Sequence, residues 1–160
     1  MKEKDINKAR QAAATLLIGA QFDRFDVSSL VLNICFVRLP KVAELPINVW
    51  LSAAGRAVFI DKSGVPTNSV PESDSDDFFA SREKLLGQLY RLIGKEITEI
   101  DIDPSGILEL HFESGNLIFA GDETDLEEIW SITSDTPEPY AKHDWAVTLT
   151  DERELVTRRP

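Results

Sequence analysis

The sequence predicts an α+β protein of two pseudo-repeats, each a helix followed by an antiparallel meander of about four to five strands, packed together. Two observations lead to this fold class. Apolar residues recur at helical spacing in two segments, and alternating apolar residues follow each of them. The tripeptide Leu17-Ile18-Gly19 also recurs as Leu92-Ile93-Gly94. A repeat spacing of roughly 75 to 89 residues is too long for a solenoid and fits duplication of a small α+β unit.

Composition divides the chain into four segments. The first α+β repeat is expected at residues 1–61, a linker at 62–77, the second repeat at 78–151, and a charged, frayed tail at 152–160. The linker is rich in small polar residues and proline, which have little to bury. We expect one compact unit, because 160 residues suit one domain and a single helix cannot cover both faces of a sheet.

A helix is predicted at the N-terminus. Ile6, Ala9, Ala13 and Leu16 follow helical spacing, and Gly19 fits a helix end. Alanine also has the highest intrinsic helix propensity, which strengthens the prediction for the middle of this segment.

Four strands are predicted to complete the first half. Residues 22–27 and 30–39 form the first two, and the second is apolar on both faces, which indicates an internal strand. Residues 47–51 and 56–60 are predicted to pair as a hairpin around Ala53-Ala54-Gly55.

The second half is predicted to repeat this order. A helix from Phe78 to Ile93 ends at Gly94, and strands follow at residues 96–103, 107–113, 117–120, 129–132 and 145–149. In the strand at 107–113, apolar and polar side chains alternate, so that it has one apolar face and one wet face. The apolar residues are Leu108, Leu110 and Phe112, and the polar ones are Glu109, His111 and Glu113.

The first strand of each half carries the same irregularity. Phe22 and Phe25 are three residues apart, as are Ile97 and Ile100, and this spacing breaks strict alternation. A β-bulge between them would return both side chains to one face. We therefore expect a bulge in both strands.

Charge and composition narrow the classes of partner. The net charge of −11 and the pI near 4.6 disfavour nucleic acid and anionic membranes and favour a basic protein, although such acidity also serves solubility alone. We expect neither a signal peptide nor a membrane span. Cys35, in an apolar run, is predicted to be a buried, unreactive thiol, and the expected location is the cytoplasm.

The motifs of catalysis and cofactor binding are missing from the sequence. Asp101-x-Asp103-x-Ser105-Gly106 is similar to the start of a calcium-binding EF-hand, but the twelfth position is Phe112 rather than glutamate, which favours a hairpin turn. His111, His143 and Asp144 lack the spacing of a metal site. Neither a nucleophile elbow nor a glycine-rich phosphate loop is present. We therefore predict no enzymatic activity, cofactor or metal.

The predicted partner-binding surface combines the wet face of strand 107–113 with the acidic stretch before Trp130. Its residues are Glu109, His111, Glu113, Asp122, Glu123, Asp125, Glu127 and Glu128. Trp130 and Trp145 are interpreted as core residues, with aromatic anchors for the partner as the alternative.

The pattern Leu108-x-Leu110-x-Phe112-x-x-Gly115-x-Leu117, followed by an acidic stretch and Glu128-Ile129-Trp130, resembles small acidic bacterial proteins. Many of these are uncharacterised, and some are immunity proteins of polymorphic-toxin and contact-dependent-inhibition systems. The resemblance implies a non-enzymatic binder that neutralises a cognate toxin through acidic residues. Two alternatives remain open: a small-molecule binder or enzyme with a site between the two repeats, and a structural subunit of a larger assembly.

Overall fold

The computed structural model describes residues 1–28, 31–42, 45–54, 56–66, 78–120, 128–134 and 145–158, without the side chains of residues 78–82. The described helices and strands are α1 (Glu3–Leu17), β1 (Gln21–Ser28), β2 (Val31–Val37), β3 (Asn48–Ala53), β4 (Ala57–Asp61), α2 (Phe78–Leu92), β5 (Ile97–Ile102), β6 (Leu108–Phe112), β7 (Gly115–Phe119), β8 (Glu128–Ser134), β9 (Ala146–Thr150) and β10 (Leu155–Arg158). The protein is therefore α+β, as predicted. Residues 67–77 of the expected linker lie outside the described part of the chain.

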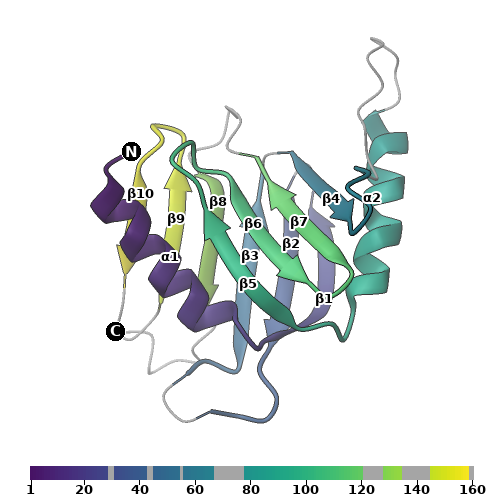
Figure 1. The fold of residues 1–160 in the computed structure, drawn as a ribbon, viewed down its shortest axis with the longest axis horizontal. Helices are drawn as coiled ribbons and strands as arrows, with labels where there is room; N and C mark the ends of the chain where they lie inside the picture. Colours follow the sequence, from purple (N-terminus) through teal and green to yellow (C-terminus); the bar gives the residue numbers. More distant parts are fainter. Residues whose placement is uncertain are drawn as a thin grey trace.

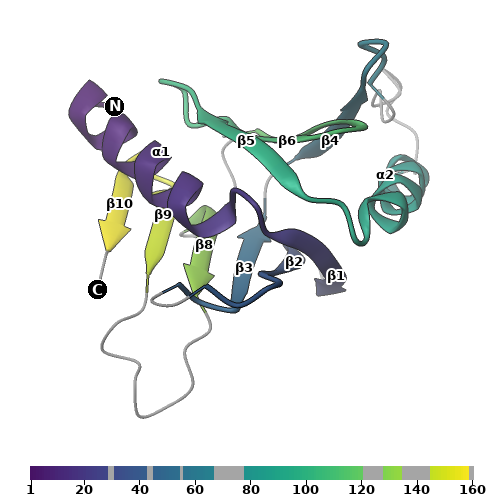
Figure 2. The ribbon, with the colours of Figure 1, turned by 60° about the horizontal axis from the view of Figure 1, so that its bottom comes forward.

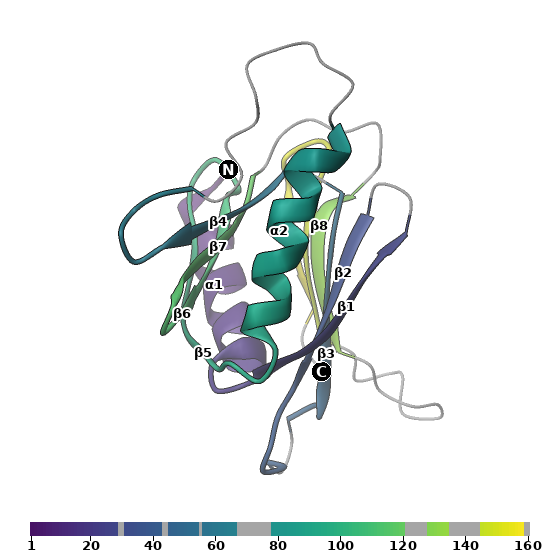
Figure 3. The same ribbon diagram turned by 90° about the vertical axis from the view of Figure 1, so that its right-hand side faces the viewer.

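Two antiparallel sheets face each other across the core (Figure 1). Sheet A has six strands in the order β1-β2-β3-β8-β9-β10, and sheet B has four in the order β4-β7-β6-β5. The helices close the two open sides of this sandwich. Helix α1 contacts β5, β9 and β10 (Figure 2), and α2 contacts β4 and lies beside β1 (Figure 3).

Helix α1 buries the stripe that its spacing predicts. Ile6, Ala9, Ala13 and Leu16 are buried, and the small alanine side chains let the helix approach both sheets closely. The carboxyl end of the helix is capped by Arg38, which follows β2. Its guanidinium donates hydrogen bonds to the carbonyl oxygens of Leu16 (2.9 Å), Ile18 (3.0 Å) and Thr15 (3.3 Å). These bonds satisfy carbonyl groups that a helix end leaves without partners.

The two predicted β-bulges are both confirmed. The register of β1 against β2 shifts between Phe22 and Arg24, and the register of β5 against β6 shifts between Ile97 and Glu99. Each shift lies at the same point after the preceding helix. In sheet B the bulge turns Glu99 toward solvent, where it lies opposite His111 of β6.

The predicted hairpin of residues 47–51 with 56–60 is wrong. β3 belongs to sheet A and β4 to sheet B, where their antiparallel partners are β8 and β7 respectively. The chain changes sheets between Ala54, whose N–H donates to Ile129 O (2.9 Å), and Arg56, whose carbonyl accepts from Ala120 N–H (2.9 Å). The meanders that open the two halves thus have three strands each, β1-β2-β3 and β5-β6-β7, rather than four to five. Alternation specifies which face of a strand is buried, but not which strand lies beside it.

The prediction of a charged, frayed tail after Asp151 is also wrong. Residues Leu155–Arg158 form β10, which pairs with β9 at the edge of sheet A. Leu155 packs against the core, and α1 lies against this strand. An alternating pattern of only four residues within a charged segment was too short to reveal the strand.

Candidate functional site

The outer face of sheet B carries a group of acidic side chains. Alternation along β6 buries Leu108, Leu110 and Phe112 in the core, which leaves Glu109 and His111 on the solvent side. The polar face that alternation predicts for this strand is therefore exposed to solvent in the structure.

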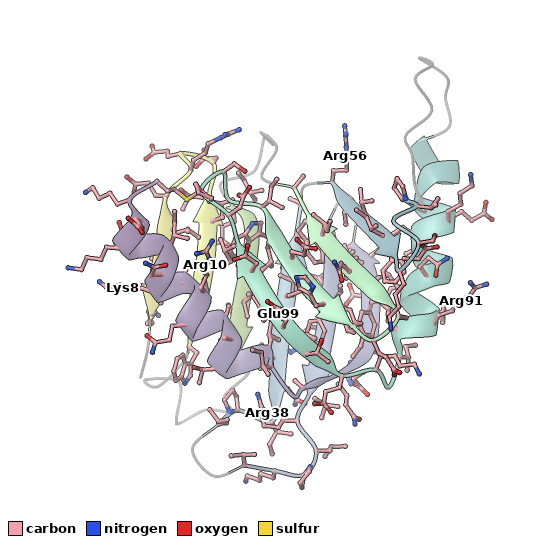
Figure 4. The ribbon with its side chains drawn as sticks, in the orientation of Figure 1. Lys8, Arg10, Arg38, Arg56, Arg91 and Glu99 are labelled. Carbon is pink, nitrogen blue, oxygen red and sulfur yellow. The ribbon has the colours of Figure 1, made fainter. Side chains whose placement is uncertain are left out.

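Strand β5 adds two carboxylates that the predicted surface did not include. Asp101 lies opposite Glu109, and Glu99 lies opposite His111. Glu113 is exposed in the turn between β6 and β7. We refer to Glu99, Asp101, Glu109, His111 and Glu113 as the acidic face. Figure 4 shows Glu99 on β5. The bulge expected between Ile97 and Ile100 was the sequence signal that could have assigned Glu99 and Asp101 to this side.

Hydrogen bonds hold the centre of the acidic face in place. Asn116 Nδ2 of β7 donates to Glu109 Oε1 at 2.7 Å, and His111 Nε2 lies 3.7 Å from the same oxygen. The side chains of Glu109 and His111 are 30% and 27% exposed, so both remain accessible to a partner. On β5, Thr98 Oγ1 donates to the carbonyl oxygen of His111 at 3.2 Å.

A cation from α1 borders this surface. Arg10 Nε lies 2.8 Å from Asp101 Oδ1 and also donates to the carbonyl oxygen of Ile102 at 2.8 Å. The position of Arg10 beside β5 can be seen in Figure 4. This contact ties the helix to the edge of sheet B and offsets the charge of Asp101. Among the described residues, no Lys or Arg side chain forms such an ion pair with Glu99, Glu109 or Glu113.

Of the remaining predicted surface residues, Glu128 lies in the described part of the chain, and it is on the other sheet. Glu128 is exposed at the start of β8, in sheet A, beside a shallow depression of about 160 Å³ that Ser52 and Ser131 also line. Asp122, Glu123, Asp125 and Glu127 fall outside the described residues. The described surface is therefore centred on β5 and β6.

The predicted core residues occupy the interior. Trp130 is 1% exposed, and its indole N–H donates to the carbonyl oxygen of Gly106 at 2.8 Å. Trp145 is partly buried against the core, and Cys35 is a buried free thiol. Trp130 is thus a core residue, not an anchor on the surface.

The Asp103–Gly106 segment is a hairpin turn, as expected. Asp103 Oδ1 accepts hydrogen bonds from the backbone N–H groups of Ser105 (2.8 Å) and Ile107 (2.9 Å). Burial alone would raise the pKa of the Asp103 carboxyl, but the hydrogen bonds from Ser105 and Ile107 outweigh it and hold the pKa below its ordinary value. Within the described ranges, no three His, Cys, Asp or Glu side chains are grouped to hold a metal ion.

The space between the sheets is filled by side chains. Buried residues of sheet A, such as Phe36 and Ile132, form one cluster with residues of sheet B such as Leu117 and Phe119. One depression lies on the exposed side of α1, and another lies on sheet A at Ser52 and Ser131. Neither lies between the two sheets.

Comparisons of the chain with protein-family models, with curated proteins and with solved structures found no match. In the part of the chain that the structure describes, no helix has the length and apolar character needed to cross a membrane.

Proposed function

We propose that this chain is a non-enzymatic binding protein that uses the acidic face of sheet B to engage a basic protein partner. The observation that carries the proposal is the arrangement of Glu99, Glu109 and Glu113 on neighbouring strands and a turn of one sheet face. Glu99 lies opposite His111, so Glu109 is its diagonal neighbour, at about 7–8 Å between Cα atoms. Such a spacing suits Lys and Arg side chains, which can contact more than one carboxylate at once.

The physical role of this surface is to attract and orient the partner. The sheet fixes the backbone at Glu99 and Glu109, and Asn116 holds the Glu109 carboxylate, so part of the ordering entropy is already lost before the partner binds. Opposite charges also speed diffusional encounter, and added salt weakens this effect. Together with the resemblance to immunity proteins, this favours a protein that covers a cationic site of a toxin in the bacterial cytoplasm.

The test compares two variants with equal net charge as bait in an extract of the organism that encodes the chain. The first carries Glu99→Gln, Glu109→Gln and Glu113→Gln, and it leaves the ion pair between Arg10 and Asp101 intact. We expect the wild-type chain to capture a basic protein and this variant to lose it. With the purified partner, the association rate should fall steeply with ionic strength for the wild type only.

The matched control carries Glu83→Gln, Glu152→Gln and Glu154→Gln, three exposed positions away from the acidic face. It should bind as the wild type does. Equal loss in both variants would mean that overall charge, not this surface, governs binding. For the immunity role, expression of the captured partner alone should arrest growth and co-expression with the wild-type chain should restore it.

We also propose that the two halves are pseudo-repeats of one ancestral unit. Helices α1 and α2 begin and end 75 residues apart, at Glu3–Leu17 and Phe78–Leu92. The bulges after Phe22 and Ile97 have the same offset. Each half then sends a strand, β4 or β8, to pair with the last strand of the other half's meander. Such an exchange is what duplication of a self-associating unit would produce.

A further inference from the structure

The outer edge of β10 carries backbone groups that point away from sheet A. Thr150 N–H donates to the Glu154 carbonyl (3.0 Å), so alternation turns the peptide groups of every second residue, from Glu154 to Arg158, toward β9. The N–H and C=O groups of Leu155 and Thr157 therefore face outward. Within the described ranges, neither residue forms a hydrogen bond on that side.

Helix α1 covers one face of β10 rather than its edge. The side chains of Leu155 and Thr157 are half-buried on the inner face of sheet A, where α1 contacts the strand. Figure 2 shows β10 as the last strand of this sheet, with α1 over its inner face. Side chains stand perpendicular to a sheet, whereas the hydrogen-bonding groups lie in its plane. The outward groups of β10 thus remain available to another strand.

The other three sheet edges are each occupied in part. At β1, the Phe22 carbonyl accepts a hydrogen bond from the loop that follows α2 (2.7 Å). At β5, the Ile102 carbonyl accepts one from Arg10 Nε (2.8 Å). At β4, Asp61 N–H donates to the Val65 carbonyl (3.4 Å). In the part of the chain that the structure describes, the edge of β10 has no such contact.

The exposed face of β10 carries an acid, a valine and a base in alternate positions. These are Glu154, Val156 and Arg158, and Val156 is 52% exposed. Among the described residues, the side chains of Glu154 and Arg158 form no ion pair. The strand therefore presents opposite charges at equal distances on either side of Val156.

This order of side chains is complementary to a second antiparallel copy of β10. If a two-fold axis passes beside Val156, each Val156 faces its own copy in a non-hydrogen-bonded pair, whose side chains approach closely. Leu155 of each copy then lies opposite Thr157 of the other, so the outward N–H and C=O groups of both residues are paired. Glu154 of each copy lies opposite Arg158 of the other.

We propose that the edge of β10 is a self-association site, at which a second copy of this chain adds its own β10 and joins the two six-stranded sheets. The same edge is used in both copies, so association ends at a dimer. The acidic face lies on the other sheet and remains open in the dimer, so this association goes beyond partner binding. Variants of Glu154 should accordingly leave partner binding unchanged.

The test measures sedimentation of the full chain from micromolar to near-millimolar concentration at physiological salt. We expect a reversible dimer. Thr157→Pro removes an outward N–H that the fold does not use, and proline is tolerated at such an edge position. This variant should stay folded, as judged by circular dichroism, and be monomeric. Thr157→Val keeps the N–H and loses only a hydroxyl group that has no partner in the described structure, so it should still dimerise.

Charge exchange tests the register. Glu154→Arg or Arg158→Glu alone places like charges opposite each other twice, and each should weaken the dimer by about ten-fold or more. An equimolar mixture of the two variants restores both opposite-charge contacts and should form a mixed dimer. Glu83→Arg and Lys84→Glu, which make the same changes of net charge at exposed positions of α2, should leave dimerisation unchanged.

Three results would overturn the proposal. A chain that stays monomeric at every concentration excludes a second copy as the occupant of this edge. A dimer that Thr157→Pro leaves intact uses another surface. If the two charge variants do not form a mixed dimer, the pairing about Val156 is wrong. These variants change only exposed side chains, so they decide the question even if proline disturbs the fold.

Discussion

Gly19 and Gly94 are joined by a reciprocal backbone exchange. The N–H of Gly19 donates to the carbonyl of Ile97 (2.9 Å), and the N–H of Gly94 donates to the carbonyl of Phe22 (2.7 Å). Each glycine ends a helix in a left-handed conformation, with φ of 78° and 80° respectively. The two halves of the chain therefore meet where each helix passes into its first strand.

Alanine at these two glycines should destabilise the protein. The left-handed conformation costs an L-residue about 1–2 kcal/mol, so Gly94→Ala should lower the free energy of unfolding by about that amount. Gly19→Ala should cost about the same, because its new methyl group would lie 3.4 Å from Arg38 Nη1, which is an ordinary van der Waals contact. Urea denaturation measures both changes. Gly87→Ala is the control of opposite sign: this helical position is open, and the variant should gain about 1 kcal/mol.

Removal of the Arg38 guanidinium should destabilise the carboxyl end of α1. Arg38→Met leaves the carbonyls of Leu16 and Ile18 without their donors, and we expect a loss of about 2–4 kcal/mol in chemical denaturation. Burial lowers the pKa of Arg38, and the nearby Glu96 carboxylate acts in the opposite direction. Arg38→Lys keeps the charge but has fewer donors, so its loss should be smaller. Equal losses in the two variants would assign the effect to shape rather than to hydrogen bonding.

Gly106 should tolerate no side chain. Its φ is 89°, and a β-carbon there would lie 2.6 Å from Leu149 Cδ2. Gly106→Ala should therefore lower the unfolding free energy by about 2–4 kcal/mol and shift Trp130 fluorescence, since Trp130 bonds to the Gly106 carbonyl. Leu149→Ala in the same chain should relieve part of the clash. If the losses of unfolding free energy in the double variant are additive, the clash with Leu149 is not the cause.

Acid should weaken the turn at Asp103. Its native pKa lies below the ordinary value of about 3.9, so its charge stabilises the fold above about pH 4 and this contribution is lost as pH falls through the native pKa. At pH 7 the free energy of unfolding should be larger for the wild type than for Asp103→Asn. This difference should become smaller toward pH 2.5. Asp61→Asn should behave likewise, because the Ser63 hydroxyl bond lowers the pKa of Asp61. A gap that stays constant with pH would contradict the prediction for both residues.

Local sequence accounts for the helices, most strands, the turn at Asp103 and both bulges. Helical spacing, alternation and turn residues act over a few neighbours, and the three-residue interval between Phe22 and Phe25 was enough to place a bulge. The wet face of β6 follows from the same alternation. Strict alternation counted from Ile97 would place Glu99 on the inner face of the sheet. The bulge after Ile97 turns Glu99 to the wet face instead.

The tertiary structure alone decided which strands are neighbours. β4 pairs with β7 and β8 pairs with β3, whereas local patterns predicted a hairpin of β3 with β4. Alternation buries one face of a strand equally well beside any neighbouring strand. Long-range packing therefore determines which strands pair. The same packing places Arg10 over the Ile102 carbonyl and leaves Val27 exposed. Sequence by itself determined the elements and their wet faces. Only the fold determined that α1 covers Ile102 whereas Val27 stays exposed, because that depends on which helix lies against each strand.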